Sequence, residues 1–334
     1  MTTSFKEHSE VVAVESENSL SEFHESQEKR LSPMELYLLR MGTDQSRKQV
    51  LYLADQIAKL VGAEDSFHCD WSKMRRDHLM LIKTSFEKKG LAPSTINLYL
   101  SVMRGIAEEA WNLGLLDDHE YAIIKAVHPA RGYRDAPGRA LTTEETKQLF
   151  TICDERESIR GVRDAAILAL GIGCGLRRAE IVSLKLADIN ETDKTFTVIG
   201  KGNKERRLYC SEIVWERLSA WIEIRGKEGC KEVFCRLVHG TVKTKEKAGY
   251  IDVQHPITRN NVYMILREFK KQIPEGKHFS PHDLRRTFAT RLFQNGADIY
   301  TVKKAMGHAA ISTTERYDKR GDEEVKRVSR LVQI

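Results

Sequence analysis

Apolar residues recur at helical spacing through the first third of the chain. The clearest helix follows Pro93-Ser94-Thr95, a typical helix-start signal. Its apolar positions form one stripe, made up of Ile96, Leu100, Met103, Ala107 and Ala110. A second stripe begins after Thr43 and comprises Val50, Leu53, Ala54, Ile57 and Leu60. We therefore expect an all-helical region here.

Two more helices are expected in the same region. Ser32 is placed to cap a helix that has Pro33 at its first position. Another helix is expected over residues 76–89, ending at Gly90. The pattern therefore predicts a helical domain over residues 32–128.

The second half of the chain is also mainly helical, with one exception. LTTEETKQLF predicts a helix start, with Thr142 or Thr143 as cap and Glu145 in the first turn. The segments TFTVI and RRLYC flank the turn GKGNKE and predict a β-hairpin. We expect a mobile insertion over 238–254 and a short C-terminal helix whose apolar side carries Val325, Val328, Leu331 and Val332. The fold class is thus mainly α with a small antiparallel β-sheet.

Two segments lack periodicity. Residues 1–31 are rich in Glu and Ser and are expected to form a disordered acidic tail. Residues 129–139 combine Pro, Gly and Arg and are the best linker candidate. The second domain is then expected over residues 140–334, including its C-terminal helix.

Composition and charge narrow the class of protein. The chain has 334 residues, 31% charged and 41% hydrophobic, and no apolar run of the ~20 residues that a membrane helix needs. The six cysteines form no CxxC pair, and no secretory signal is visible, so we expect a cytoplasmic protein with reduced thiols. Residues 1–30 carry a formal charge of −4, which leaves +10 on the rest of the chain. A basic body favours a polyanionic partner such as nucleic acid, although many soluble proteins of this charge bind none.

Several polar and basic side chains are candidate DNA contacts. Asn97, Ser101 and Arg104 share one face of the helix that follows Pro93, and this face is either solvated or turned to DNA. The arginines of the linker can touch phosphates along the way. The full candidate set is Ser94, Thr95, Asn97, Ser101, Arg104, Arg131, Arg134 and Arg139.

The segment SPHDLRRTFATRL offers an anion site. Ser280-Pro281 marks a helix start, and His282 and Arg285 lie three residues apart on one face. Free N–H groups at a helix N-terminus attract anions, and a guanidinium can hold two phosphate oxygens at once. Taken alone, this segment is better explained by an ordinary surface helix.

Two further segments carry basic side chains. Arg177 and Glu180 lie three residues apart, either as a surface salt bridge of little value or as a carboxylate that holds a phosphate-binding arginine. Lys201 lies between two glycines in the predicted hairpin turn, from which a lysine can reach a minor groove or a scissile site, and Lys204 or Arg206 can do the same. A lysine in a turn is usually just solvated.

Tyr317, in ISTTERYDKR, is the candidate nucleophile. A free phenol has a pKa near 10, so ionising one at pH 7 costs roughly 4 kcal/mol, which nearby arginines and a histidine acceptor can offset. A tyrosinate that attacks a phosphodiester forms a phosphotyrosine and expels a sugar hydroxyl. Two arginines and histidine donors would stabilise the transition state, and Lys201 would protonate the leaving 5′-oxygen. No metal or other cofactor is required.

Together these segments resemble the tyrosine recombinase (phage integrase) superfamily, and most closely its Xer-like branch. GCGLRRAEI resembles the first arginine box, with Arg177 and Glu180; VIGKGNKERRL resembles the hairpin with the catalytic lysine, Lys201. SPHDLRRTFAT resembles the His-x-x-Arg box, with His282 and Arg285, and MGHAAISTTERY resembles the final box, with His308 and Tyr317. The four boxes occur in the family's order, and the resemblance covers roughly residues 40–334.

The resemblance implies a fold and a reaction. Residues 32–128 would form a helical, SAM-like core-binding domain, and residues 140–334 a catalytic domain of the DNA breaking-rejoining fold. Dimers would grip each double-stranded recombination site, and a tetrameric synapse, joined through C-terminal helices, would exchange strands through a 3′-phosphotyrosine and a Holliday junction without ATP. The protein would work in the cytoplasm on the nucleoid, either in integration and excision of a mobile element or in Xer-like resolution.

Some residues depart from the family pattern. Ala309 and Ala310 replace the serines often found after the last histidine, and Arg178 stands where a smaller residue is common.

Two other functions use similar residues on the same fold. One is a type IB topoisomerase, which relaxes supercoils by the same cut. The other is a non-catalytic DNA-binding regulator.

Overall fold

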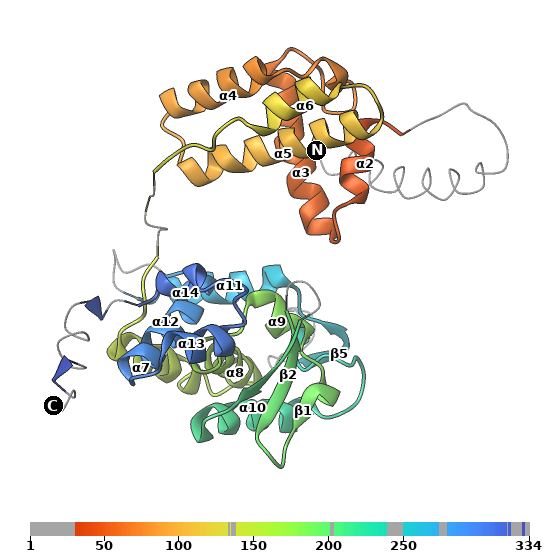
Figure 1. Cartoon of the computed structure of the whole chain (residues 1–334). Coiled ribbons are helices and arrows are strands. Elements are labelled where there is room, and N and C mark those ends of the chain that lie inside the picture. The colour runs from red at the N-terminus through yellow and green to blue at the C-terminus, as the bar shows by residue number, and fades with distance from the viewer. Residues whose placement is uncertain are drawn as a thin grey trace. The chain divides into compact units, whose positions relative to one another are not determined.

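The computed structural model describes residues 31–132, 134, 138–200, 204–238, 250–273, 279–318, 320–321 and 329–330. The chain divides into two compact units, Met1–Ala136 and Pro137–Ile334. Figure 1 shows helices in the first unit and helices with small sheets in the second. Nowhere in the described ranges is a helix both long enough and apolar enough to cross a membrane.

The first unit packs its helices around α5. Its helical segments are α2 (Pro33–Leu39), α3 (Asp44–Leu60), the short 3₁₀ helix η2 (Trp71–Lys73), α4 (Arg76–Lys88), α5 (Pro93–Asn112) and α6 (Asp118–Lys125). α5 contacts α2, α3, α4 and α6. The close fit is visible at Gly105, where an added Cβ would lie 2.1 Å from the ring of Tyr37. A side chain at this position would therefore push α2 away from α5.

The helix starts and the main apolar stripe are confirmed. Ser32 caps α2 in a capping box with Glu35. The stripe of α5 is buried along its whole length, at Ile96, Leu100, Met103, Ala107 and Ala110. The stripe of α3 is buried except at its last member, Leu60, which is exposed at the end of the helix.

The second unit surrounds α8. Its helices are α7 (Thr143–Asp154), α8 (Ile159–Gly173), α9 (Arg178–Ser183), the 3₁₀ helix η3 (Leu186–Asp188), α10 (Glu212–Arg225), α11 (Arg259–Lys270), α12 (Pro281–Gln294), α13 (Ile299–Met306) and α14 (Ser312–Glu315). α7, α10 and α12 pack against α8, which is buried over most of its length. A helix from late in the chain, α12, is thus held by one from the beginning of the unit (Figure 1).

The predicted hairpin is confirmed and belongs to a larger sheet. β1 (Ile189–Asn190), β2 (Thr195–Ile199) and β3 (Glu205–Tyr209) form an antiparallel sheet in that order. Phe196 lies opposite Leu208 and both are buried, so this pair anchors one face of the hairpin in the core. The register brings the start of β3 next to Ile199 and Gly200, at the tip of the hairpin.

The expected mobile insertion over 238–254 is wrong at both ends. β4 (Cys235–Val238) and β5 (Tyr250–Pro256) form a second antiparallel pair, with Val238 opposite Tyr250. The pairing register shifts between Cys235 and Arg236, and exposure does not alternate along β5, so the sequence lacks the usual strand pattern. Its centre, 239–249, lies outside the described residues, as do the tail 1–30, Lys201 and the apolar stripe of the expected C-terminal helix.

Both ends of the predicted linker contact the units beside them. In the first unit, the side-chain amide of Asn97 donates to the Ala130 carbonyl (3.1 Å) and accepts from its N–H (2.8 Å). In the second, the Arg139 N–H donates to Asp283 Oδ1 (3.0 Å). The division between the units, at 136/137, falls between these two attachments.

Candidate active site

The site is built around the first turn of α12. Asp283, at the third position of this helix, is buried and accepts hydrogen bonds from the Ser280 backbone and hydroxyl, both at 2.8 Å. This capping arrangement fixes the helix N-terminus. His282 and Arg285, on either side of Asp283 in the sequence, lie three residues apart on one side of the helix, as predicted.

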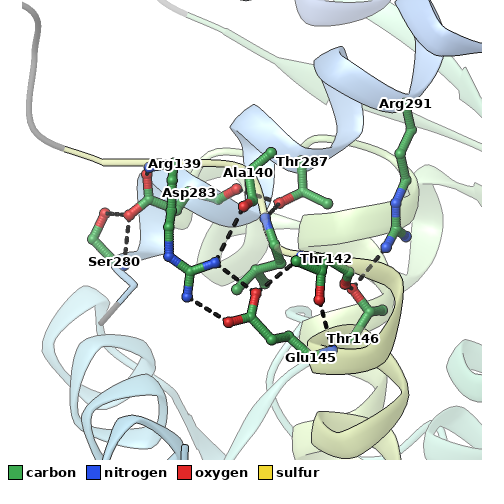
Figure 2. Close-up of polar contacts among 10 residues, drawn as sticks. Arg139, Ala140, Thr142, Glu145, Thr146, Ser280, Asp283, Thr287 and Arg291 are labelled. Carbon is green, nitrogen blue, oxygen red and sulfur yellow. Dashed lines mark hydrogen bonds and ion pairs between the residues drawn. The ribbon is translucent and has the colours of Figure 1, made fainter. Parts of the chain in front are cut away.

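A polar network ties the start of the second unit to α12 (Figure 2). Arg139 pairs with both carboxylate oxygens of Glu145, at 2.5 and 2.7 Å, while its N–H reaches Asp283. One turn further along α12, the Thr287 hydroxyl accepts from the Leu141 N–H (2.8 Å) and donates to the Asp283 carbonyl (2.7 Å). Residues 139–141 therefore run along α12 and are bonded to it at two successive turns.

Arg285 is a buried cation. Its residue exposure is 1%, and its two terminal nitrogens donate to the carbonyls of Gly175 and Met306. Its Nε has no hydrogen-bond partner, and no carboxylate of the described ranges forms an ion pair with it. Burial, assisted by the positive charge of Arg177, lowers its pKa to about 9, so it remains charged at neutral pH. A buried charge without a counter-ion is costly, and it favours a bound anion.

Arg177 lies at the N-cap of α9 and is held by Glu180. The Glu180 carboxylate accepts from the Arg177 backbone (2.8 Å) and from its Nη1 (2.7 Å). Arg206, on β3, donates to both oxygens of the same carboxylate, at 2.9 and 2.8 Å. Burial opposes ionisation of Glu180, but these bonds outweigh it and lower its pKa to about 2. Of the two readings of the Arg177–Glu180 pair, the structure supports the carboxylate that fixes an arginine.

Tyr317 contacts both histidines in space. Its hydroxyl lies 3.0 Å from His282 Nε2, and its ring stacks on His308 with a centroid distance of 5.9 Å. The phenol is largely buried, with 6% residue exposure. His308 follows Gly307, whose left-handed backbone (φ 61°) ends α13. Its Nδ1 lies 2.9 Å from the hydroxyl of the buried Thr314. Segments 35 residues apart thus place a phenol against an imidazole.

The two histidines are poised to be neutral. Burial, together with the charges of Arg285 and Arg177, lowers the pKa of His308 to about 4. Desolvation of the ring, followed by the charges of Arg285 and Arg286, also lowers the pKa of His282, although part of that residue is exposed. A neutral imidazole has one nitrogen free to accept a proton. His282 Nε2 can therefore accept the phenolic proton of Tyr317.

The structure brings five of the six predicted catalytic residues into one cluster: Arg177, His282, Arg285, His308 and Tyr317. The sixth, Lys201, lies outside the described residues. Its neighbour Gly200 is next to the cluster, because a Cβ there would lie 3.7 Å from Glu180 Oε1.

The candidate DNA contacts do not form one set. Asn97 and Arg104 use their polar atoms inside the first unit, on the carbonyls of Ala130 and Val127. Of the three polar side chains expected on the DNA-facing side of α5, two therefore already form hydrogen bonds within the first unit. Four of the candidate DNA contacts are exposed, namely Ser94, Ser101, Arg131 and Arg134. Thr95 is half-buried. Arg139, also half-buried, belongs to the second unit and pairs with Glu145.

Sequence reasoning missed three supporting groups. Asp283 is visible in hindsight as the acidic third residue after the capping Ser280. Thr314, the partner of His308, carries no such signal. Arg206 was considered only as an alternative to Lys201 for reaching a scissile site, whereas its guanidinium binds Glu180.

The class of protein follows from comparison with known families. Residues 139–324, more than half of the chain, match the phage integrase family, so the chain belongs to that family. The matched region includes every residue of the cluster.

The relatives of this chain include tyrosine recombinases. The chain is 36% identical over 192 residues to a tyrosine recombinase XerC of Caldanaerobacter subterraneus subsp. tengcongensis, covering 56% of this chain and 48% of that relative. It is 27% identical over 280 residues to a tyrosine recombinase XerC of Vibrio cholerae, covering 84% and 82%.

Solved structures share the fold at low sequence identity. One is the Tn1549 transposon integrase in complex with transposon right end DNA, with a TM-score of 0.63 and 16% identity over 90% of this chain and 99% of that one. Another is a lambda integrase dimer bound to a COC′ core site, with a TM-score of 0.62 and 15% identity over 86% and 93%. These likenesses agree with the predicted fold class, mainly helical with small antiparallel sheets.

Proposed function

We propose that the chain is a site-specific tyrosine recombinase whose nucleophile is Tyr317. The observation that carries this proposal is the buried Arg285, a cation with no carboxylate partner in the described structure, beside a phenol in hydrogen-bond distance of a histidine. A DNA phosphate would supply the missing negative charge. The family membership and the tyrosine recombinases among its relatives support the same reaction.

In the proposed cleavage step, the Tyr317 oxygen attacks the scissile phosphorus and its proton passes to His282 Nε2. The bond from phosphorus to the 5′-oxygen breaks, and that oxygen takes a proton from Lys201. Arg177 and Arg285 stabilise the charge that accumulates on the non-bridging oxygens, and His308 contributes a donor. The 5′-hydroxyl of a partner strand then reverses these steps and releases Tyr317. Because the phosphotyrosine conserves the bond energy, the scheme needs neither ATP nor a metal.

The proposal extends to partners. The first unit, with its exposed Ser94, Ser101, Arg131 and Arg134, would bind one side of a double-stranded recombination site, and the second unit would cut it. A dimer would occupy each site and a tetramer would form the synapse, joined through C-terminal segments, in the cytoplasm on the nucleoid. Relatives named tyrosine recombinase XerC support the Xer-like role, resolution of DNA. Integration or excision of a mobile element is the second role that the proposal includes.

The test is covalent capture on a nicked duplex, whose short leaving strand diffuses away and traps the protein–DNA adduct. The wild-type chain should form the adduct and Tyr317→Phe should form none, since only the phenolic oxygen is lost. Tyr300→Phe, at an exposed tyrosine of α13, is the matched control and should react normally. An adduct that survives in Tyr317→Phe would refute the assignment of the nucleophile.

A second measurement separates recombination from relaxation. A plasmid that carries two sites should be recombined, while a supercoiled plasmid without a site should stay supercoiled. Relaxation of the plasmid without a site would instead assign the chain to type IB topoisomerase activity.

A further inference from the structure

One carboxylate in the site serves two arginines. Each oxygen of Glu180 accepts two hydrogen bonds, one from Arg177 and one from Arg206, at 2.7–2.9 Å. A carboxylate has about four lone-pair positions, so Glu180 is saturated. Arg206 takes the bidentate geometry, which is the strongest form of this pair.

The two arginines differ in side-chain exposure and in how many guanidinium nitrogens they place on Glu180. The side chain of Arg206 is 11% exposed, both of its terminal nitrogens are bound to Glu180, and its Nε is buried without a partner. The side chain of Arg177 is 34% exposed and puts only one guanidinium nitrogen on Glu180. Arg177 therefore has the more accessible guanidinium, whereas both terminal nitrogens of Arg206 are committed to Glu180.

Arg206 is also fitted into the turn before His308. A Cβ on Gly307 would lie 2.9 Å from Arg206 Nη1, and the Gly307 carbonyl accepts from Arg177 Nη2 at 3.3 Å. β3, α9 and the end of α13 thus meet at the Arg206 guanidinium.

We propose that Arg206 is a positioning residue that keeps Arg177 available to the scissile phosphate, an inference that rests on the function proposed above. Without Arg206, the buried Glu180 would lose two of its four hydrogen bonds. An unsatisfied buried carboxylate is costly, so Arg177 would turn its remaining nitrogens onto Glu180. That bidentate pair would withdraw Arg177 from the transition-state phosphate.

The experiment compares two scissile groups in the full-length chain. Arg206→Met should cut an ordinary nicked duplex about 10- to 100-fold more slowly than wild type, somewhat less than the loss of a direct donor. On a duplex with a methylphosphonate at the scissile position, which lacks one negative charge, the difference should shrink to about 3-fold or less, because less charge needs stabilising. Arg206→Lys, which keeps the charge but not the bidentate geometry, should fall between wild type and Arg206→Met.

Two controls keep the outcome clear. Arg207→Met changes the next, exposed residue of β3 and should cut both substrates at the wild-type rate. Thermal unfolding of each variant shows whether a slow variant is folded. Equal slowing of Arg206→Met on both substrates would overturn the proposal and leave Arg206 a scaffold residue only. Failure of the proposed function looks different: the wild-type chain itself would then form no adduct that depends on Tyr317.

Discussion

α5 in the first unit and α12 in the second begin alike and are buried differently. Each has a proline at its first position, Pro93 and Pro281. α5 buries an almost wholly apolar face, whereas the buried side of α12 includes Asp283, Arg285 and Thr287. Apolar burial stabilises α5 directly. α12 needs hydrogen bonds to offset the desolvation of its polar groups, and Arg285 is only partly compensated.

The contrast separates stability from activity. A helix that buries charge where leucine would serve the fold better is retained for a reason other than folding. We therefore expect substitutions in α5 to change the free energy of unfolding and substitutions in α12 to change the rate of DNA cleavage.

The largest effect is expected from Arg285→Met. Removing the buried guanidinium should slow adduct formation about 1000-fold, because a charge-stabilising donor is lost. The free energy of unfolding should stay the same or rise, since an apolar side chain of similar length replaces an unpaired buried charge. Adduct kinetics and urea denaturation measure the two quantities. A variant that is less stable but cuts DNA at the wild-type rate would show that Arg285 serves stability and not activity.

Leu100→Ala is the counterpart in α5. This fully buried leucine should cost about 3 kcal/mol of stability through lost burial and the cavity left behind. At saturating DNA and low temperature, the folded fraction should cut at the wild-type rate. The exposed Leu98→Ala, in the same helix, should change the unfolding free energy much less. Similar losses for the two variants would argue against the packing of α5 described above.

Thr287→Val tests the attachment of α12 to residues 139–141. The change leaves the buried N–H of Leu141 without an acceptor, which should lower the stability of the second unit by about 2 kcal/mol. Thr290→Val, at a half-buried position of the same helix, should have a smaller effect. Chemical denaturation measures both, and equal effects would show that the bond to Leu141 contributes nothing.

The smallest effect is a pH dependence from His308. Its pKa is about 4 in the fold and near 6.5 when unfolded, so the unfolded chain binds the extra proton first as the pH falls. Stability should thus be lost as the pH drops from about 6.5 through 4, by about 1 kcal/mol after solvent screening. His308→Gln should remove this part of the dependence, as followed by thermal unfolding between pH 4 and 7. An unchanged pH profile in the variant would contradict the lowered pKa.

The same contrast shows what a sequence can predict. α5 followed from its apolar stripe, and the hairpin from its alternation, because local patterns specify both. The candidate catalytic residues were found as spaced motifs, and the structure brings five of them together. The bonds of Arg206 to Glu180 and of Asn97 to Ala130 were not predictable, because they join segments that only tertiary folding brings together. β4 and β5 were missed because the pairing register shifts between Cys235 and Arg236 and exposure does not alternate along β5.

The most direct test of the whole account is to identify the atom that joins protein and DNA. Trapped adduct would be digested with protease and nuclease, and the modified peptide sequenced by mass spectrometry. We predict a nucleotide esterified through its 3′-phosphate to the hydroxyl of Tyr317. A nucleotide attached elsewhere, or attached through its 5′-phosphate, would contradict the proposed chemistry.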